Sequence, residues 1–413
     1  MNASANHSAA GIQEIPVNLG YLVPEFPTQT HNFFWKEINA LRAQGVEVHI
    51  YSTRIPNTAT SPHPFREQAL RQTTYLFPPS TIRTLCFALS HPQKIVHALQ
   101  YIHALSEAST GEKLRIIGLI PSAIELLYSC AEKGITHIHC HSCATAAHLV
   151  NICRRLGGPT FSLTLHGDMP VYGRDHKEKM ADARFVACVT KPLQQDVLEL
   201  TGKPIDQVPL IRMGVDTTVF APSQQNQTQA GKLTLVTVAR LNPSKGIEYA
   251  LNAITESKRM GYEITYLIAG EGPYRQVLEE LIDKLDLGGS VRLLGTTPEN
   301  EVIALLHRSD AFVLPSIGLG EAAPVSVMEA MSCGVPVVCS RIGGTPDMIS
   351  DGVDGFLTPQ RDVRALLQAF TTLTDDPILR KTLGENARAR AVREFDYVSM
   401  AKELLRHIVA GTG

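Results

Sequence analysis

Residues 311–340 read AFVLPSIGLGEAAPVSVMEAMSCGVPVVCS, and this stretch decides the fold. It predicts an apolar strand over Ala311–Leu314, a helix over Val325–Ser332 and a second strand over 335–339. Pro324 suits the first turn of that helix, because a backbone N–H is not needed there. Strands that alternate with helices in this way predict a parallel sheet covered by helices.

The same alternation extends outward and divides the chain into two α/β halves. The other predicted strands are 17–23, 46–51, 137–140, 161–165, 185–190, 233–239, 264–269 and 291–294. The predicted helices are 32–44, 124–133, 144–156, 193–200, 247–260, 274–285 and 299–307, with a long helical stretch over 379–409. Residues 56–111 are less regular, and we expect helical insertions there.

A linker separates the halves, because residues 221–231, APSQQNQTQAG, are polar and contain Pro and Gly. We expect a flexible tail over 1–14, a first domain over 15–212, a linker over 213–232 and a second domain over 233–394. Both domains are predicted to be doubly wound and Rossmann-like. Two such sheets place their best ligand site in the cleft between them, at the carboxyl ends of the strands.

The composition is that of a globular protein: of 413 residues, 44% are hydrophobic and 19% are charged. A formal net charge of -2 gives no basic field, so no nucleic-acid partner is expected. The N-terminus lacks the pattern of a secretory signal, and Pro121 and Glu125 interrupt the most apolar run, so no membrane-spanning helix is expected. Eight scattered cysteines are typical of reduced thiols in the cytoplasm.

Two glutamates and two cations are the strongest candidates for chemistry. Glu321 and Glu329 would lie about 12 Å apart on a helix that rises about 1.5 Å per residue. The two carboxyls of a retaining glycosidase lie about 5 Å apart, so this pair is better suited to the two ends of one long ligand. Arg240 and Lys245 flank a turn between a strand and a helix, a position that suits a diphosphate.

These motifs resemble glycosyltransferase family 4, the glycosyl transferases group 1 enzymes. Glu321, seven residues, Glu329, a small-residue turn and PVV look like the family signature. The resemblance implies that Glu321 contacts hydroxyls of the donor sugar and that Glu329 holds the ribose of its nucleotide. It also places in the donor site the backbone between them, at Ala322, Ala323, Pro324 and Val325.

Two further segments of the second half carry the same resemblance. VARLNPSKG is similar to the family's GRL…KG motif, with Ala239 in place of the usual Gly. The resemblance implies that Arg240 and Lys245 neutralise the leaving diphosphate. Gly270 and Gly272 look like the family's G-x-G-P turn, which brings the backbone close to the donor.

In the first half, His166 closes a predicted strand and resembles the family's catalytic-site histidine, which touches the donor sugar. Asp168 is expected to orient this ring or to meet the acceptor. The first loop lacks the family's GG pair, and its PEFP pattern resembles the exopolysaccharide, colanic-acid-type subgroup. Glu25, Thr30 and His141 are acceptor-side candidates, and Thr30 is alternatively a helix N-cap.

The resemblance implies the GT-B architecture, with residues 395–413 completing the first domain. It implies a retaining glycosyltransferase that moves a sugar from a nucleotide-sugar, UDP- or GDP-linked, to a glycan or polyprenyl-linked acceptor. No Asp-x-Asp triplet is present to hold a metal ion, so neither a metal nor another cofactor is expected. We expect a cytoplasmic protein, with the inner face of the cytoplasmic membrane as a further location.

Several alternatives remain open at this stage. A sugar-nucleotide epimerase and a non-catalytic nucleotide-sugar-binding partner protein would share the fold. His137, His139 and His141 share one face of a strand and suit zinc, although ordinary packing explains them as well. Cys140 and Cys143 have the spacing of a redox pair. Residues 81–105 suggest peripheral membrane contact, for which ordinary amphipathic helices are the alternative.

Overall fold

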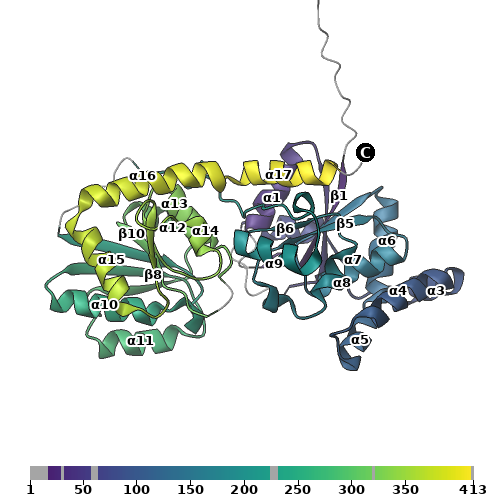
Figure 1. Cartoon of the computed structure of the whole chain (residues 1–413), viewed down its shortest axis with the longest axis horizontal. Coiled ribbons are helices and arrows are strands. Elements are labelled where there is room, and N and C mark those ends of the chain that lie inside the picture. Colours follow the sequence, from purple (N-terminus) through teal and green to yellow (C-terminus); the bar gives the residue numbers. More distant parts are fainter. Residues whose placement is uncertain (1–16, 29–31, 57–63, 224–230, 319–320, 411–413) are drawn as a thin grey trace, which may run out of the picture.

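The computed structural model describes residues 17–28, 32–56, 64–223, 231–318 and 321–410. It contains two six-stranded parallel sheets (Figure 1). The first has the strand order β3-β2-β1-β4-β5-β6, and the second has the order β12-β11-β10-β7-β8-β9. Read from the opposite edge, the second sheet repeats the order of the first. The predicted pair of doubly wound α/β sheets is therefore confirmed.

The strands of the first sheet are β1 Asn18–Glu25, β2 Glu47–Arg54, β3 Thr73–Tyr75, β4 His137–Cys140, β5 Thr160–Leu165 and β6 Val186–Cys188. Those of the second are β7 Lys232–Val238, β8 Glu263–Ala269, β9 Val291–Gly295, β10 Ala311–Leu314, β11 Val337–Ser340 and β12 Gly355–Thr358. In each sheet the strand order reverses beside the first strand, between β1 and β4 and between β7 and β10. Doubly wound sheets bind their ligands at this switch point.

The helices before the linker are α1 Asn32–Ala43, α2 Arg66–Gln72, α3 Thr81–Ser90, α4 Pro92–Ala104, α5 Thr110–Ile117, α6 Ile120–Glu132, α7 Thr145–Arg155, α8 His176–Ala181 and α9 Lys191–Thr201. Those after it are α10 Ile247–Arg259, α11 Arg275–Lys284, α12 Glu299–His307, α13 Val325–Ser332, α14 Thr345–Met348, α15 Val363–Asp375, α16 Pro377–Glu394 and α17 Tyr397–Val409. The 3-10 turns are η2 Met169–Tyr172, η3 Ile205–Gln207 and η4 Pro243–Lys245. Strands β3 and β12 and helices α8, α14 and α15 were not predicted.

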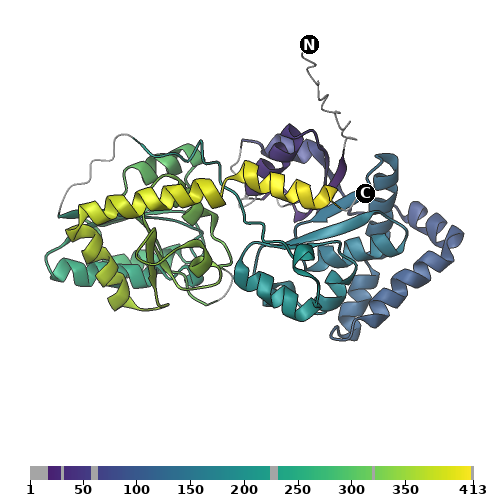
Figure 2. The same cartoon turned by 45° about the horizontal axis from the view of Figure 1, so that its top comes forward.

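Two helices occupy the helical stretch predicted over 379–409, and the second begins at Tyr397, near residue 395, from which the chain is expected to complete the first domain. Phe395 is fully buried, and the side chain of Asp396 caps a new helix by accepting a bond from the Ser399 backbone N–H at 2.9 Å. Helix α16 runs along the second sheet, and α17 continues onto α1 of the first (Figure 2). There Ala401 and Leu404 join the core beneath α1. The domain boundaries given above stay a prediction.

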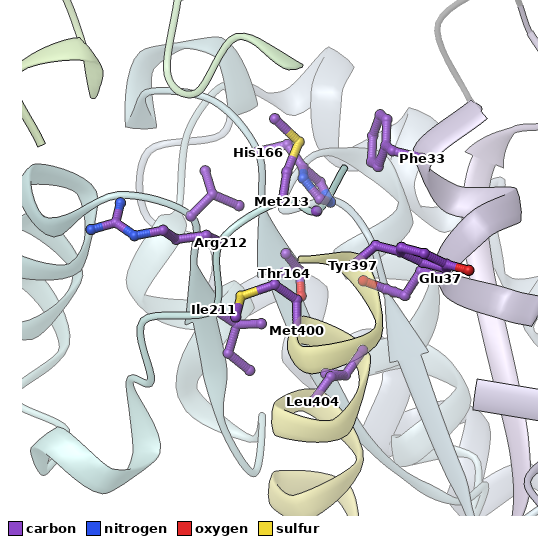
Figure 3. A pocket seen from close by; sticks show the side chains of 12 residues that line it. Phe33, Glu37, Thr164, His166, Ile211, Arg212, Met213, Tyr397, Met400 and Leu404 are labelled. Atoms are coloured by element: carbon purple, nitrogen blue, oxygen red, sulfur yellow. The ribbon is translucent and has the colours of Figure 1, made fainter. Parts of the chain in front are cut away.

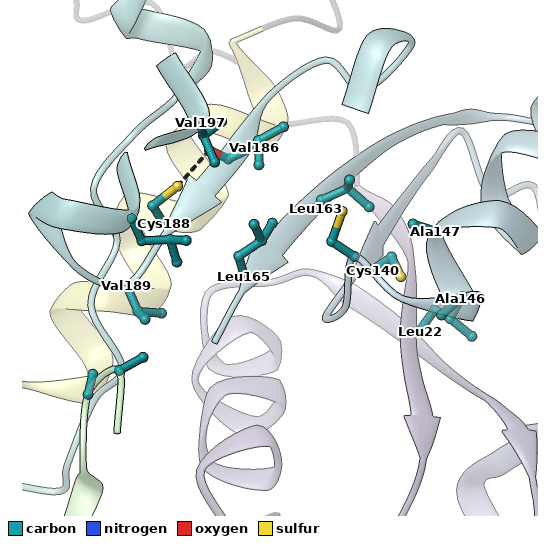
Figure 4. Close-up of a cluster of buried hydrophobic side chains, with 14 of the residues drawn as sticks. Leu22, Cys140, Ala146, Ala147, Leu163, Leu165, Val186, Cys188, Val189 and Val197 are labelled. Atoms are coloured by element: carbon teal, nitrogen blue, oxygen red, sulfur yellow. Dashed lines mark hydrogen bonds between the residues drawn. The ribbon is translucent and has the colours of Figure 1, made fainter. Parts of the chain in front are cut away.

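The strands of the first sheet are buried on both faces. Leu163 and Leu165 of β5 pack beside Val186 of β6, and Ala146 and Ala147 of α7 cover the neighbouring strand β4 (Figure 4). Strands β4, HIHC, and β5, TFSLTL, alternate polar and apolar residues, and the polar side chains of His137, His139, Ser162 and Thr164 are buried as well.

By length and composition alone, one helical stretch, Thr110–Glu132, could cross a membrane; it has 23 residues and a hydropathy of 1.5. It contains the apolar run interrupted by Pro121 and Glu125, from which no membrane-spanning helix was expected. The stretch consists of α5 and α6 in succession, and α6 buries Ala123, Ile124 and Leu126 in the core of the first sheet. A core helix passes the same test of length and composition.

Candidate functional site

The loop after β10 and the start of α13 bring the two predicted donor-site glutamates to one edge of the second sheet. Glu321 is buried at 7% exposure, whereas Glu329 is half-buried within α13. Helix α13 begins only at Val325, so the helical spacing estimated for the pair does not apply to its first four residues. Ala322 and Ala323 are buried beside Glu321, and Pro324 precedes the helix as predicted.

The turn that contains Gly343 and Gly344 contacts the Glu321 loop directly. The N–H of Gly344 donates to the Ala322 carbonyl at 2.8 Å, and Gly343 has a φ of +49°. A Cβ on Gly343 would collide with the carbonyl oxygen of Glu321. Glycine is therefore required here to hold the Glu321 loop in place.

Lys245 lies beside Glu321 and forms an ion pair with its Oε1. The other carboxylate oxygen, Oε2, is buried and has no hydrogen-bond partner among the described residues. A buried acceptor without a partner costs free energy, so this atom is suited to receive a hydroxyl of a ligand. Lys245 lies in η4, and a Cβ on the following Gly246 would collide with the Pro315 carbonyl after β10.

Arg240 follows β7 and differs from Lys245 in its surroundings. It is exposed and forms no ion pair with any residue that the structure describes. Gly270 and Gly272 pack on this strand end, where Cβ atoms would collide with the carbonyls of Ala239 and Leu241. The two glycines are thus explained by close approach to the chain's own backbone, and their contact with a donor stays a prediction.

Glu329 is influenced by residues from both halves of the chain. Burial raises its pKa to about 7, Lys36 of α1 acts to lower it, and Glu299 of α12 acts to raise it. Lys36 itself bridges to Glu299, with 3.0 Å between Nζ and Oε2, and lies over the ring of Phe220 at 5.3 Å. A first-sheet cation therefore reaches across to the carboxylates of the second sheet.

In the first half, the carboxyl ends of β4 and β5 carry the predicted histidines. Nδ1 of His141 lies 3.0 Å from Nε2 of His166, and Nε2 of His141 lies 3.2 Å from Oε1 of Glu37 in α1. The hydroxyl of Tyr21 donates to the same oxygen at 2.7 Å. Figure 3 shows His166, Glu37 and Phe33 around a cavity of about 10 Å³, beside Tyr397 at the start of α17.

The rings of His141 and His166 share one N–H···N hydrogen bond, in which either nitrogen can be the donor, depending on the tautomer of each ring. The sequence reasoning missed Glu37 and Tyr21, although a carboxylate three residues from Phe34 on the apolar face of a helix was a signal for Glu37.

The two other histidines of β4 are satisfied by hydroxyls. His137 bonds Thr160 and Ser162 at 2.8 Å, and His139 bonds Ser162 at 2.7 Å and Thr164 at 2.8 Å. Burial lowers the pKa of both rings, that of His137 to about 3. Among the described residues no group of three or more His, Cys, Asp or Glu is arranged to hold a metal. Burial also raises the pKa of Cys140 and Cys143, which disfavours a redox pair.

The remaining acceptor-side candidates are Glu25, Asp168 and Thr30. Glu25 ends β1 and pairs with Arg54 at 2.7 Å. Asp168 precedes η2, whose Tyr172 hydroxyl accepts the N–H groups of His166 and Gly167 at 2.6 and 2.8 Å. Thr30 lies outside the described residues, as does the tail predicted over 1–14.

Comparison with known proteins identifies a family for the second half of the chain. Residues 221–390 match the family described as "Glycosyl transferases group 1". WcaL of Escherichia coli, assigned to colanic acid biosynthesis, is 35% identical over 50% of this chain and 52% of its own length. The amylovoran biosynthesis glycosyltransferase AmsK of Erwinia amylovora is 30% identical over 54% of this chain and 55% of its own length. The chain spans about half the length of the curated relatives it matches.

Solved structures share the fold over nearly the whole chain. The Anabaena protein HepE, crystallised with UDP, matches with a TM-score of 0.71 and 17% identity over 95% of this chain and all of its own. HepE with UDP-glucose gives a TM-score of 0.70. Sucrose-phosphate synthase of Thermosynechococcus elongatus matches with a TM-score of 0.71 and 19% identity, over 96% of this chain and all of its own. The chain therefore has the GT-B fold, and its residues 221–390 match the glycosyl transferases group 1 family, glycosyltransferase family 4.

Proposed function

We propose that the protein transfers a sugar from a nucleotide-sugar to a glycan or polyprenyl-linked acceptor, with retention of the anomeric configuration. The observation that carries the proposal is the buried pair of Glu321 and Lys245, in which one carboxylate oxygen has no partner among the described residues. A sugar hydroxyl would satisfy that oxygen, and the lysine beside it would face the diphosphate.

In the proposed reaction the diphosphate leaves toward Lys245 and Arg240. Negative charge that develops on the leaving group is stabilised by these cations and by the N–H groups at the start of α13. The acceptor hydroxyl attacks from the face that the diphosphate leaves, and its proton passes to the departing phosphate. These groups supply the positive charge, so the proposal needs no metal ion.

The two sheets have different tasks in this proposal. Glu329 holds the ribose, and burial, which raises its pKa, keeps it in a weakly solvated environment. His166 lies at the first sheet and contacts the donor sugar, with Glu37 and His141 behind it. Asp168, Glu25 and Thr30 remain acceptor-side candidates.

The process we propose is exopolysaccharide or cell-envelope synthesis in the cytoplasm. This follows the assignment of WcaL and AmsK to colanic acid and amylovoran biosynthesis. UDP and GDP are both candidates for the base: HepE is described with UDP, and a mycobacterial relative with 27% identity is named for GDP-mannose.

A thermal-shift screen against UDP, GDP, ADP and their sugar conjugates, with and without EDTA, tests the donor class. At 100 times its Kd a ligand adds about 2.7 kcal/mol of stability, which corresponds to a rise in Tm of about 5–10 °C for a domain of this size. One stabilising diphosphate, unaffected by EDTA, supports the proposal. No shift at millimolar concentration with any of them would contradict it.

Turnover then separates a transferase from a protein that only binds. Glu329→Ala and Lys245→Ala should nearly abolish release of the nucleoside diphosphate from the identified donor. Glu385→Ala is a matched control, because Glu385 is an exposed carboxylate of the same half. Normal turnover in either site variant would refute the assignment, and a wild-type protein that leaves every donor intact would be a binding protein.

A further inference from the structure

Helices α3, α4 and α5 carry an unusual concentration of exposed apolar side chains. Eight of the 20 exposed large hydrophobic residues of the described chain lie within residues 77–117: Phe77, Ile82, Leu85, Leu89, Val96, Leu99, Leu114 and Ile117. We call this segment the helical arm. In Figures 1 and 2 its helices lie at the end of the molecule away from the second sheet.

The apolar residues of α3 form one stripe that faces solvent. Ile82, Leu85 and Leu89 are 77%, 60% and 75% exposed, and their spacing places them on one face of the helix. The opposite face packs inward, where Phe87 is buried and Arg83 pairs with Glu125 of α6 at 2.7 Å. Because the outward face is the apolar one, packing against the domain does not explain this stripe.

The charge of the arm is opposite in sign to that of the rest of the chain. Residues 77–117 contain four Lys and Arg against two Asp and Glu, whereas the whole chain has a net charge of -2. Both carboxylates bind backbone within the fold: Glu107 accepts from the Asp175 N–H at 2.9 Å, and Glu112 from the Ser109 N–H at 2.7 Å. From residue 68 to residue 106 the chain has no Asp or Glu.

We propose that the helical arm is a docking surface for an anionic phospholipid bilayer. Its apolar stripe would enter the boundary between headgroups and acyl chains, with Lys94, Lys113 and Arg115, the basic residues other than the paired Arg83, at the level of the headgroups. A second copy of the chain is a poorer occupant, because a two-fold contact would place the same positive patches against each other. The inference goes beyond the proposed transfer reaction, since lipid binding can be measured without any donor or acceptor.

Vesicle flotation of the full chain tests the proposal. We expect the protein to float with vesicles of phosphatidylglycerol and phosphatidylcholine, and added salt to weaken the binding. The triple variant Ile82→Ser, Leu85→Ser, Leu89→Ser should bind vesicles at least about tenfold more weakly than the wild type, because it removes the apolar stripe. All three side chains are exposed, so the fold should be retained, which thermal unfolding checks.

A matched control removes equally exposed apolar residues elsewhere. Ile205→Ser, Met260→Ser, Ile378→Ser changes side chains that are 62%, 60% and 80% exposed, outside the arm. This control should float like the wild type. No flotation of the wild type, or equal flotation of the stripe variant, would overturn the proposal.

Two further readouts separate a membrane from a protein partner. Cys86 lies on the same stripe and is the one exposed cysteine of the eight, so an environment-sensitive dye can be attached there without mutation. Its emission should shift to shorter wavelength with anionic vesicles and stay constant with phosphatidylcholine alone. A wild type that is dimeric in light scattering, with a monomeric stripe variant and no dye response to vesicles, would assign the surface to self-association and overturn the proposal.

Discussion

Replacing Glu321 by glutamine should strengthen the binding of a free nucleoside diphosphate. The carboxylate pairs with Lys245, and the two side chains are 8% and 18% exposed. A diphosphate that enters the site competes with Glu321 for this ammonium group. Glutamine is similar in size but carries no charge, so Lys245 becomes available to the phosphate.

The size of the effect follows from the ion pair. Two unit charges about 4 Å apart interact by about 4 kcal/mol at an effective dielectric constant of about 20. Most of this is offset because the charges are desolvated, and a hydrogen bond to a charged group contributes about 1.5–3 kcal/mol net. Allowing for the partial exposure of Lys245, we expect a gain of about 1–2 kcal/mol, or about 5- to 30-fold in Kd.

Isothermal titration with the diphosphate and with its sugar conjugate is the assay. In the wild type the conjugate should bind better than the diphosphate, because its sugar hydroxyl meets the buried Oε2 of Glu321. In the variant that preference should shrink while the diphosphate binds more tightly. Glu385→Gln, at an exposed pair with Lys381, should change neither affinity. Weaker binding of the diphosphate to the Glu321 variant would refute the reasoning.

Three other predictions concern the first half and its contacts with the second. Glu37→Gln removes a buried carboxyl that lies 3.2 Å from His141, whose ring bonds His166, so kcat should fall about 10- to 100-fold with the donor KM unchanged. An unchanged kcat would contradict this. Because burial raises the pKa of Glu329 to about 7, nucleotide affinity should fall as the pH drops through 7. Lys36 acts to lower this pKa, so Lys36→Met should move the midpoint of the affinity profile to higher pH. An affinity that does not change with pH would exclude Glu329 as a ligand of the ribose. Asp347→Asn breaks the buried ion pair with Arg212 of the first half, in which 2.7 Å separates Nη1 from Oδ2. The free energy of unfolding in urea should fall by about 3–5 kcal/mol. A fall of less than about 1 kcal/mol would show that this ion pair does not stabilise the contact between the halves.

The second half was the easier to predict from sequence. Its strands between Lys232 and Ser340 alternate with amphipathic helices, and a hydrophobic period identifies such elements directly. Strands β3, TTY, and β12, GFLT, contain too few apolar residues for the sequence alone to identify them, and each pairs with one neighbour at an edge of its sheet. The start of α17 was expected from the resemblance, which assigns residues 395–413 to the first domain, and it follows the buried Phe395.

For the site, the sequence predicted which residues lie near the donor better than it predicted which residues they contact. Glu321 and Lys245 were both expected to meet the donor, but nothing in the sequence predicted that they pair with each other. The same holds for Asp347, which bonds Arg212 and the backbone N–H of Lys191. Such partners are separated by 76 to 156 residues: Lys245 and Glu321 become neighbours when the second sheet forms, and Asp347 meets Arg212 and Lys191 when the two halves of the chain come together.

The two places where the chain passes between the sheets are bonded to each other. The Val215 N–H donates to the Phe395 carbonyl at 2.7 Å, and the Tyr397 N–H donates to the Val215 carbonyl at 3.1 Å. A single connection between the two sheets would allow them to rotate relative to each other about any axis. Two connections that are hydrogen-bonded to each other allow the sheets to rotate about one axis and restrict rotation about the others. Each closure therefore returns Lys36 to the same carboxylates, so the cleft can open for exchange of ligands without losing the alignment of its two walls.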